Sequence, residues 1–135
     1  HGDLNASNEL ADTEGNISAI LDFEFVTEDL RVMELCVCLS EIINMKQEET
    51  ELWLKLNKFV EGYGKHVKLY RTEVDVVPIL IMLRRLDVFV HFLGRYWEGI
   101  DGKEIILDQT KNVISQAQWL NLNQQRLTSL TELLL

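Results

Sequence analysis

The chain has 135 residues, of which 22 are acidic and 13 basic, so its formal net charge is −9. Apolar residues make up 47% and charged residues 26%, a balance that excludes a disordered or collagen-like chain and indicates one globular domain. The negative charge argues against nucleic acid as a partner, and the longest apolar run, 76–83, is far shorter than the roughly 20 residues that cross a bilayer.

A small hairpin is the first expected element. A turn-forming Asp-Thr-Glu-Gly-Asn run separates two short extended segments, 9–11 and 17–21. Apolar residues then recur at helical spacing, which predicts a first helix over 30–45. Cys36 and Cys38 lie on different sides of this helix, so they form neither a disulfide nor a shared metal site. We interpret both as small core residues of a reducing, cytoplasmic protein.

Four further helices are expected from the same periodicity. One starts near Gln47 and has an apolar stripe that ends at Tyr70, and the others lie near 75–97, 104–118 and 123–134. Pro78 is tolerated because it falls in a first helical turn. The last helix is amphipathic and is expected to cover the core. The fold class is therefore mainly α (α+β), a small β-hairpin followed by about five helices, and not a doubly wound sheet.

Two short segments carry the chemical signal. Asp3 and Asn8 lie on the first loop, and Asp22 directly follows an apolar strand. Their oxygen atoms are the hard ligands that suit Mg²⁺. Phosphoryl transfer needs such a trio, because one carboxylate accepts the proton of the attacking hydroxyl while an amide and a second carboxylate hold the metal ions at the nucleotide phosphates. The sequence therefore predicts a phosphoryl-transfer site.

The order of these residues also matches a known pattern. His-Gly-Asp-x-x-x-x-Asn at 1–8 followed by Asp-Phe-Glu at 22–24 resembles the catalytic loop and metal segment of the aminoglycoside phosphotransferase superfamily, which includes homoserine kinase and choline kinase. The resemblance implies a protein-kinase-like C-terminal lobe, with ATP and Mg²⁺ as cofactors. It implies that Asp3 is the catalytic base and that Asn8 and Asp22 bind Mg²⁺.

The same resemblance assigns supporting roles and a division of the chain. His1 and Gly2 would support the shape of the loop, and the helix start that follows resembles that of the family with Glu34 in place of the usual Asp. We divide the single partial domain into a catalytic loop and metal segment, 1–29, and a helical subdomain, 30–135.

The nucleotide-binding lobe of this superfamily precedes the catalytic loop and has no counterpart in these residues. The chain opens at His1 without an initiator Met or a leader. We therefore interpret it as the later part of a two-lobed enzyme and expect this piece alone to be inactive. Apolar faces that would meet the missing segments are expected to be exposed and to favour self-association.

The expected acceptor is a small molecule with a hydroxyl and an amine, such as homoserine, choline or an aminoglycoside. Glu24, Glu28 and Asp29 place negative charge near the metal segment, which attracts an amine. Polar residues also recur at intervals of three or four on the helix near 75–97. This stripe is either a solvated, salt-bridged face or, in part, the border of the acceptor pocket. Its members are Arg84, Asp87, His91, Arg95 and Glu98.

A second class of function stays open at this stage, a non-catalytic interaction protein that keeps the kinase fold. Proteins of that kind usually lack the base or a metal ligand. Asp3, Asn8 and Asp22 are all present, which favours the enzyme. The sequence does not choose among the three acceptors.

Overall fold

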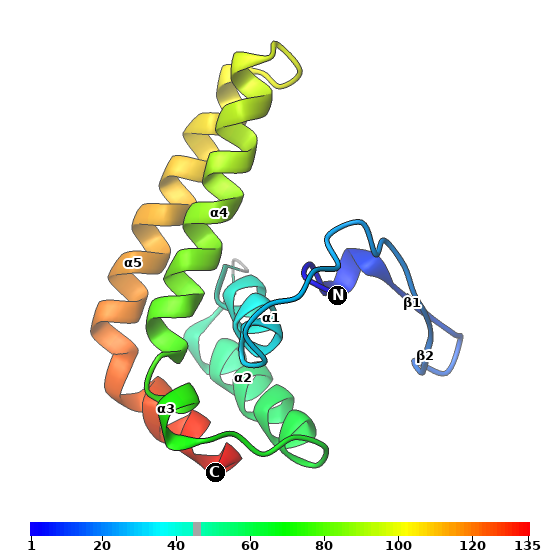
Figure 1. The fold of residues 1–135 in the computed structure, drawn as a ribbon, viewed down its shortest axis with the longest axis vertical. Helices are drawn as coiled ribbons and strands as arrows, with labels where there is room; N and C mark the ends of the chain where they lie inside the picture. The colour runs from blue at the N-terminus through cyan, green and yellow to red at the C-terminus, as the bar shows by residue number, and fades with distance from the viewer. Residues whose placement is uncertain (45–46) are drawn as a thin grey trace.

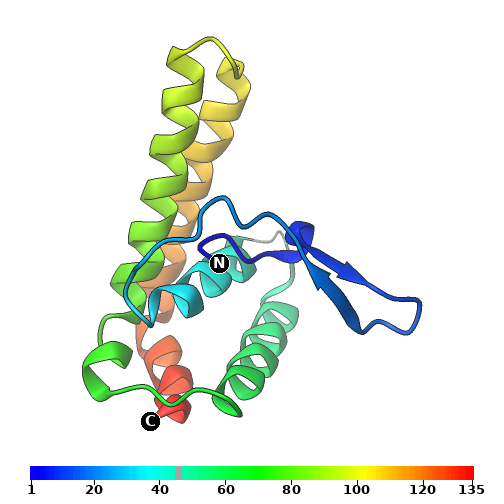
Figure 2. The same ribbon diagram turned by 45° about the vertical axis from the view of Figure 1, so that its right-hand side comes forward.

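The computed structural model describes residues 1–44 and 47–135. Two antiparallel helices, α4 (Val77–Trp97) and α5 (Lys103–Thr131), lie side by side along most of their length, and one half of this pair extends beyond the rest of the chain (Figure 1). The other helices gather around its opposite half (Figure 2). The helices of the described residues are α1 (Met33–Asn44), α2 (Glu49–Gly64), α3 (Arg71–Val74), α4 (Val77–Trp97) and α5 (Lys103–Thr131), with short 3-10 turns at Ala6–Asn8 and Glu132–Leu134.

The core lies where α1 packs on α4 and where α2 and the end of α5 close over it. Leu35 and Leu39 of α1, Leu56 of α2, Ile81 of α4 and Leu127 of α5 are completely buried. Leu35 and Leu39 are four residues apart, so they share one face of α1. The expectation that the amphipathic C-terminal segment covers the core is confirmed.

The predicted hairpin is confirmed as β1 (Glu9–Ala11) and β2 (Ile17–Ile20), which pair antiparallel. Its turn forms locally, because Asp12 Oδ1 accepts the backbone N–H groups of Glu14 and Asn16, both at 2.9 Å. The hairpin points away from the helices (Figure 2). It therefore contributes little to the core and leaves the loop before it, residues 1–8, and the segment after it beside α1.

The helices predicted near 104–118 and 123–134 form one continuous helix, α5, so the predicted break is wrong. No Gly or Pro lies between 118 and 123. Leu120 is buried and Trp119 packs against the core, so this part of the helix is held by tertiary contacts. The weak helix propensity of Asn121 and Asn123 in this stretch costs only about 0.7 kcal/mol each. The tertiary contacts offset this cost.

The second predicted helix is α2, which ends at Gly64 and does not reach Tyr70. Gly62 and Gly64 each cost about 1 kcal/mol relative to Ala in a helix. The chain then leaves the helix, and the backbone N–H of Leu69 donates to Leu134 O at 2.8 Å. Tyr70 is 73% exposed, so the prediction that it continues the apolar stripe is wrong.

The other predicted helices match more closely. The first is found as α1, and its predicted last residue, 45, lies outside the described residues. Pro78 lies in the first turn of α4, as predicted. Cys36 and Cys38 are free and buried, which confirms them as core residues. Burial raises the pKa of each thiol to about 12, so neither is a reactive thiolate near neutral pH.

Many large apolar side chains are exposed, above all on the hairpin, on the segment after it and on the outer faces of α4 and α5. Phe23 is 58% exposed, Val90 61% and Trp97 76%. Surfaces of this kind favour association, so self-association of the chain stays a prediction. Among the described residues, no helix is long and apolar enough to cross a membrane.

Candidate functional site

His1 joins the loop of residues 1–8, predicted to be the catalytic loop, to the segment after β2. Its Nδ1 accepts the backbone N–H of Asp3 at 3.2 Å, and its Nε2 lies 2.8 Å from Leu21 O. Because Nδ1 accepts, Nε2 is the nitrogen that carries the proton and donates. The imidazole also lies against the ring of Phe23, with the ring centroids 4.9 Å apart. Asp3 and Asp22 are thus held on two segments that His1 ties together.

Glu34 fixes the same loop from the first turn of α1. Its Oε2 accepts the backbone N–H of Gly2 at 3.0 Å and lies 3.2 Å from the backbone nitrogen of His1. Glu34 lies in the first turn of α1, so the packing of α1 sets the position of its carboxylate. The loop is therefore anchored to the helical core through one side chain.

Gly2 lies where no other residue fits. Its φ is +83°, which favours glycine, and a Cβ atom there would lie 2.4 Å from Phe25 O. The loop thus approaches the backbone of Phe25 too closely for a side chain. The sequence places Gly2 as a support of the loop, and this close approach gives that role a physical cause.

We expect Gly2→Ala to disrupt this loop more than the matched change Gly15→Ala in the hairpin. Both glycines have positive φ, so each variant pays about 1–2 kcal/mol for the left-handed backbone. Only at position 2 does the new Cβ also meet the backbone, because nothing lies within 4 Å of a Cβ at Gly15. Amide NMR shifts should therefore change across residues 1–8 and 21–34 in Gly2→Ala and stay local in Gly15→Ala. Equal, local effects of both variants would contradict the close packing.

Asp3 and Asn8 meet in one hydrogen-bonded group. The side-chain amide of Asn8 donates to Asp3 O at 2.9 Å and to Asp3 Oδ2 at 3.3 Å. Asn5 donates to the same two oxygens at 3.0 and 3.4 Å. The other carboxylate oxygen, Oδ1, forms an ion pair with Arg84 of α4. Both oxygens of the proposed base are therefore engaged.

The backbone just before Asp22 is bonded to the loop that carries Asp3 and Asn8. The N–H of Leu21 donates to Asn8 O at 2.8 Å, which brings the end of β2 to the catalytic loop. Asp22 has φ 61° and is the only non-glycine residue with a positive φ in the part of the chain that the structure describes. Such a backbone is strained for Asp by about 1–3 kcal/mol, a cost that is often found at functional sites.

The residues fit a Mg²⁺ ion in the type of donor. The amide nitrogen of Asn8 donates within the loop, which leaves its side-chain oxygen chemically able to act as a ligand, and Asp22 is an exposed carboxylate on the segment that follows β2. No group of three or more His, Cys, Asp or Glu residues suited to a metal occurs in the described part of the chain. Mg²⁺ does not need such a cage, because it binds through one or two carboxylates and the phosphates of a substrate.

A cavity of about 410 Å³ opens beside Asp3, and we call it the Asp3 cavity. Ligand pockets usually measure about 300–1,000 Å³, so a small molecule fits. Its wall is mixed in charge, with three acids and two bases, and also includes the apolar side chains of Phe25, Val88 and Phe92. Its charged and titratable residues are Asp3, Glu41, Arg84, Arg85, Asp87 and His91.

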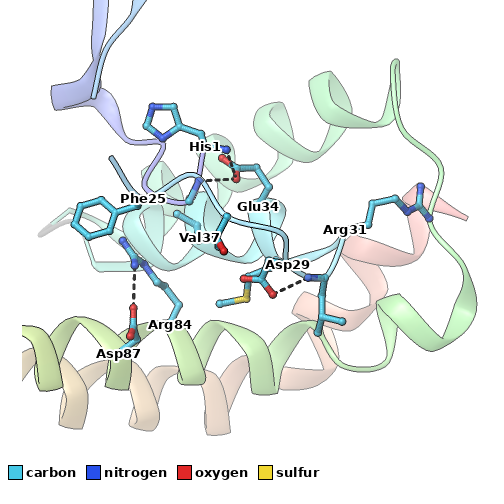
Figure 3. Close-up of a pocket in the computed structure, with 12 residues that line it drawn as sticks. His1, Phe25, Asp29, Arg31, Glu34, Val37, Arg84 and Asp87 are labelled. Carbon is cyan, nitrogen blue, oxygen red and sulfur yellow. Dashed lines mark hydrogen bonds and ion pairs between the residues drawn. The ribbon is translucent and has the colours of Figure 1, made fainter. Parts of the chain in front are cut away.

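A second cavity of about 350 Å³ lies between the loop of residues 1–8, α1 and α4, and we call it the Glu34 cavity (Figure 3). His1, Glu34 and Asp29 line it. Phe25, Arg84 and Asp87 line both cavities, so the two cavities share one wall. Glu34 Oε1 is buried and has no hydrogen-bond partner among the described residues. A bridging water satisfies an atom of this kind in many proteins.

The residues predicted for the acceptor pocket divide into two groups. Arg84 and His91 line the Asp3 cavity. Glu24 and Glu28 are exposed and line neither cavity, and Asp29 lines only the Glu34 cavity. Arg95 forms an ion pair with Asp101 at 2.6 Å at the far end of α4. One part of the polar stripe therefore lines the cavity and the other part lies on the surface, because α4 is longer than the cavity.

Sequence reasoning missed a buried polar cluster behind the Asp3 cavity. Arg85 is only 2% exposed. It donates to Glu41 Oε1 at 3.0 Å and to Gln116 Oε1 at 3.1 Å, and Gln116 in turn donates to Ser40 O at 2.8 Å. Burial lowers the pKa of Arg85, whereas Glu41 raises it, and the guanidinium stays charged near neutral pH. The cluster joins α1, α4 and α5.

One signal pointed to this cluster, because Arg85 follows directly on Arg84 at the end of an apolar run. Successive helical residues are about 100° apart, so one of the two faces the core when the other faces the loop. Periodicity alone did not tell which.

No family model, curated protein or solved structure matches this chain. The likeness to the aminoglycoside phosphotransferase superfamily therefore stays a prediction from the two motifs.

Proposed function

We propose that the protein is an ATP-dependent phosphotransferase that acts on a hydroxyl group of a small molecule. One observation carries the proposal: Asp3 and Asn8 share hydrogen bonds, and the Leu21 to Asn8 backbone bond brings the Asp22 segment to them. Phosphoryl transfer requires a carboxylate, an amide and a second carboxylate, and these two segments supply all three residue types.

In this reaction the acceptor oxygen attacks the γ-phosphorus of ATP. The bond from that phosphorus to the β–γ bridging oxygen breaks, and ADP leaves with its electron pair. Asp3 accepts the proton of the acceptor hydroxyl, so that a phosphate ester, ADP and a proton result. The acceptor would lie in the Asp3 cavity, since this cavity contains the base.

Asn8 and Asp22 would hold Mg²⁺. When bound, the ion neutralises charge on the phosphates. Asn8 also has a role of its own, because its amide donates to Asp3 and so positions the base. Within the acceptor cavity, an amine would meet Glu41 and Asp87, and not Glu24 and Glu28, which line neither cavity.

The test is a transfer assay with the full-length protein, ATP, Mg²⁺ and homoserine, choline and an aminoglycoside as acceptors. We expect ADP release that depends on the acceptor and stops on chelation of Mg²⁺. Asp22→Asn should lower kcat at least about tenfold, as loss of a metal ligand does. Asn tolerates positive φ, so this change removes the charge and spares the backbone.

Asp75→Asn is the matched control, because Asp75 is exposed and lines neither cavity. Its kcat should equal that of the unchanged protein. Binding of the nucleotide without transfer to any acceptor would instead favour the non-catalytic kinase-fold protein. Transfer that is insensitive to Asp22→Asn would contradict the metal assignment.

A further inference from the structure

Arg84 lies between the proposed base and the acceptor cavity. Its guanidinium forms ion pairs with Asp3 Oδ1 and, at 3.2 Å, with Asp87 Oδ2. The side chain of Arg84 is only 11% exposed, that of Asp3 is 23% exposed and that of Asp87 is 69% exposed. Asp3 is therefore the partner that matters most for the buried charge, because Asp87 is largely solvated.

The other guanidinium of the Asp3 cavity, that of Arg85, already has its hydrogen-bond partners within the protein. Arg85 is held by Glu41 and by two neutral residues of the buried cluster, and it is more deeply buried than Arg84. Arg84 Nε, in contrast, has no hydrogen-bond partner in the described part of the chain. Among the cations of the cavity wall, Arg84 is the one whose partners can change during a reaction.

Phosphoryl transfer changes the main partner of Arg84. When Asp3 takes up the hydroxyl proton it loses its negative charge, so its ion pair with Arg84 is lost at that moment. A nearly buried guanidinium is then left with Asp87 alone. Loss of a partner is unfavourable for a charge that is shielded from water. Another anion beside Arg84 would offset that loss.

We propose that the acceptor carries an anionic group, a carboxylate or a phosphate, that Arg84 binds as Asp3 becomes protonated. This inference rests on the proposed function and narrows its acceptor class. A guanidinium suits both groups, because its fork of N–H donors matches their oxygens. The contact is stronger in the transition state than before it, so it raises kcat as well as lowering KM. Arg84 is thus a specificity-determining residue.

The test compares acceptors that differ only in the anion. The full-length protein is assayed with ATP, Mg²⁺ and two matched sets: homoserine against its amide, and glycerate and glycerol 3-phosphate against glycerol, with choline as the cationic acceptor. In whichever set the protein accepts, we expect kcat/KM to be at least about tenfold higher for the anionic acceptor than for the neutral one. One charged hydrogen-bonded contact has an effect of this size. Glycerate against glycerol 3-phosphate tells carboxylate from phosphate.

Arg84→Gln should abolish this preference, because it lowers kcat/KM for the anionic acceptor and brings it to the level of the neutral one. Arg84→Lys keeps the charge without the fork and should keep part of the preference. It also serves if Arg84→Gln folds poorly, which a thermal melt reveals. Lys58→Gln removes one exposed positive charge on α2 and should leave the preference unchanged.

Three results would overturn the inference, and they can be told apart. Choline, glycerol or homoserine amide used as well as the anionic acceptors would overturn it alone. An equal fall in kcat/KM for all acceptors in Arg84→Gln would also overturn it, because Arg84 would then serve only as an anchor of Asp3. Absence of transfer to every acceptor would remove the proposed function and the inference together.

Discussion

Asp3→Asn is expected to lower kcat for phosphoryl transfer by about a hundredfold to ten-thousandfold, the usual contribution of a general base. The change keeps the size of the side chain and an oxygen that can accept from Asn5 and Asn8. It replaces the carboxylate that accepts the proton by a neutral amide. The measurement is ADP release by the full-length protein under saturating ATP, with KM for ATP as a second readout that should change little.

The substitution also breaks the ion pair with Arg84, so fold has to be separated from chemistry. Asp3→Glu keeps the charge and can pair with Arg84, but its carboxylate lies one methylene further from the backbone. It should therefore retain the melting temperature and still lose most of kcat. Asp75→Asn is again the exposed control. Full activity of either Asp3 variant would rule out Asp3 as the base.

Glu41→Ala is expected to lower the free energy of unfolding by about 3–5 kcal/mol, because it leaves the buried Arg85 without its charged partner. Arg85→Met should cost less, about 1–3 kcal/mol, since it removes hydrogen bonds but strands no buried charge. The side chain of Glu41 is 28% exposed and can be hydrated when Arg85 is gone. The double variant should therefore resemble Arg85→Met and not the sum of both changes.

Urea unfolding followed by circular dichroism measures these costs. Glu49→Ala is the matched control, because Glu49 is 70% exposed and lies 3.9 Å from Arg126. Its effect should stay within about 0.5 kcal/mol, as for most surface changes. If Glu41→Ala costs no more than Glu49→Ala, the buried pair does not hold α1, α4 and α5 together. Additive costs in the double variant would equally contradict a direct interaction.

Local features of the fold were predictable because they depend on neighbours in the chain. The hairpin follows from Asp12, whose side chain bonds the backbone of its own turn. The start of α4 follows from Pro78, which fits only a first turn. The break placed in α5 was wrong, because Leu120 and Trp119 stabilise the helix by contacts with residues far away in the sequence.

The candidate site was predictable to the same extent. The spacing of Asp3 and Asn8 within one loop predicted their proximity, and their hydrogen bonds lie within that loop. Glu24 and Glu28 are near the metal segment in sequence but face solvent on a segment that borders neither cavity. Closeness along the chain therefore predicted charge near the motif but not the wall of a pocket.

The hairpin, the helical body and the proximity of Asp3 to Asn8 follow from the sequence, because turn chemistry, periodicity and spacing act over a few residues. The contact of Arg84 with Asp3, which lies 81 residues away, and the burial of Arg85 depend on how the helices pack. A helix fixes the angle between two successive side chains but not its own rotation. The packing of α4 against α1 and α5 sets that rotation and so decides which arginine reaches the loop.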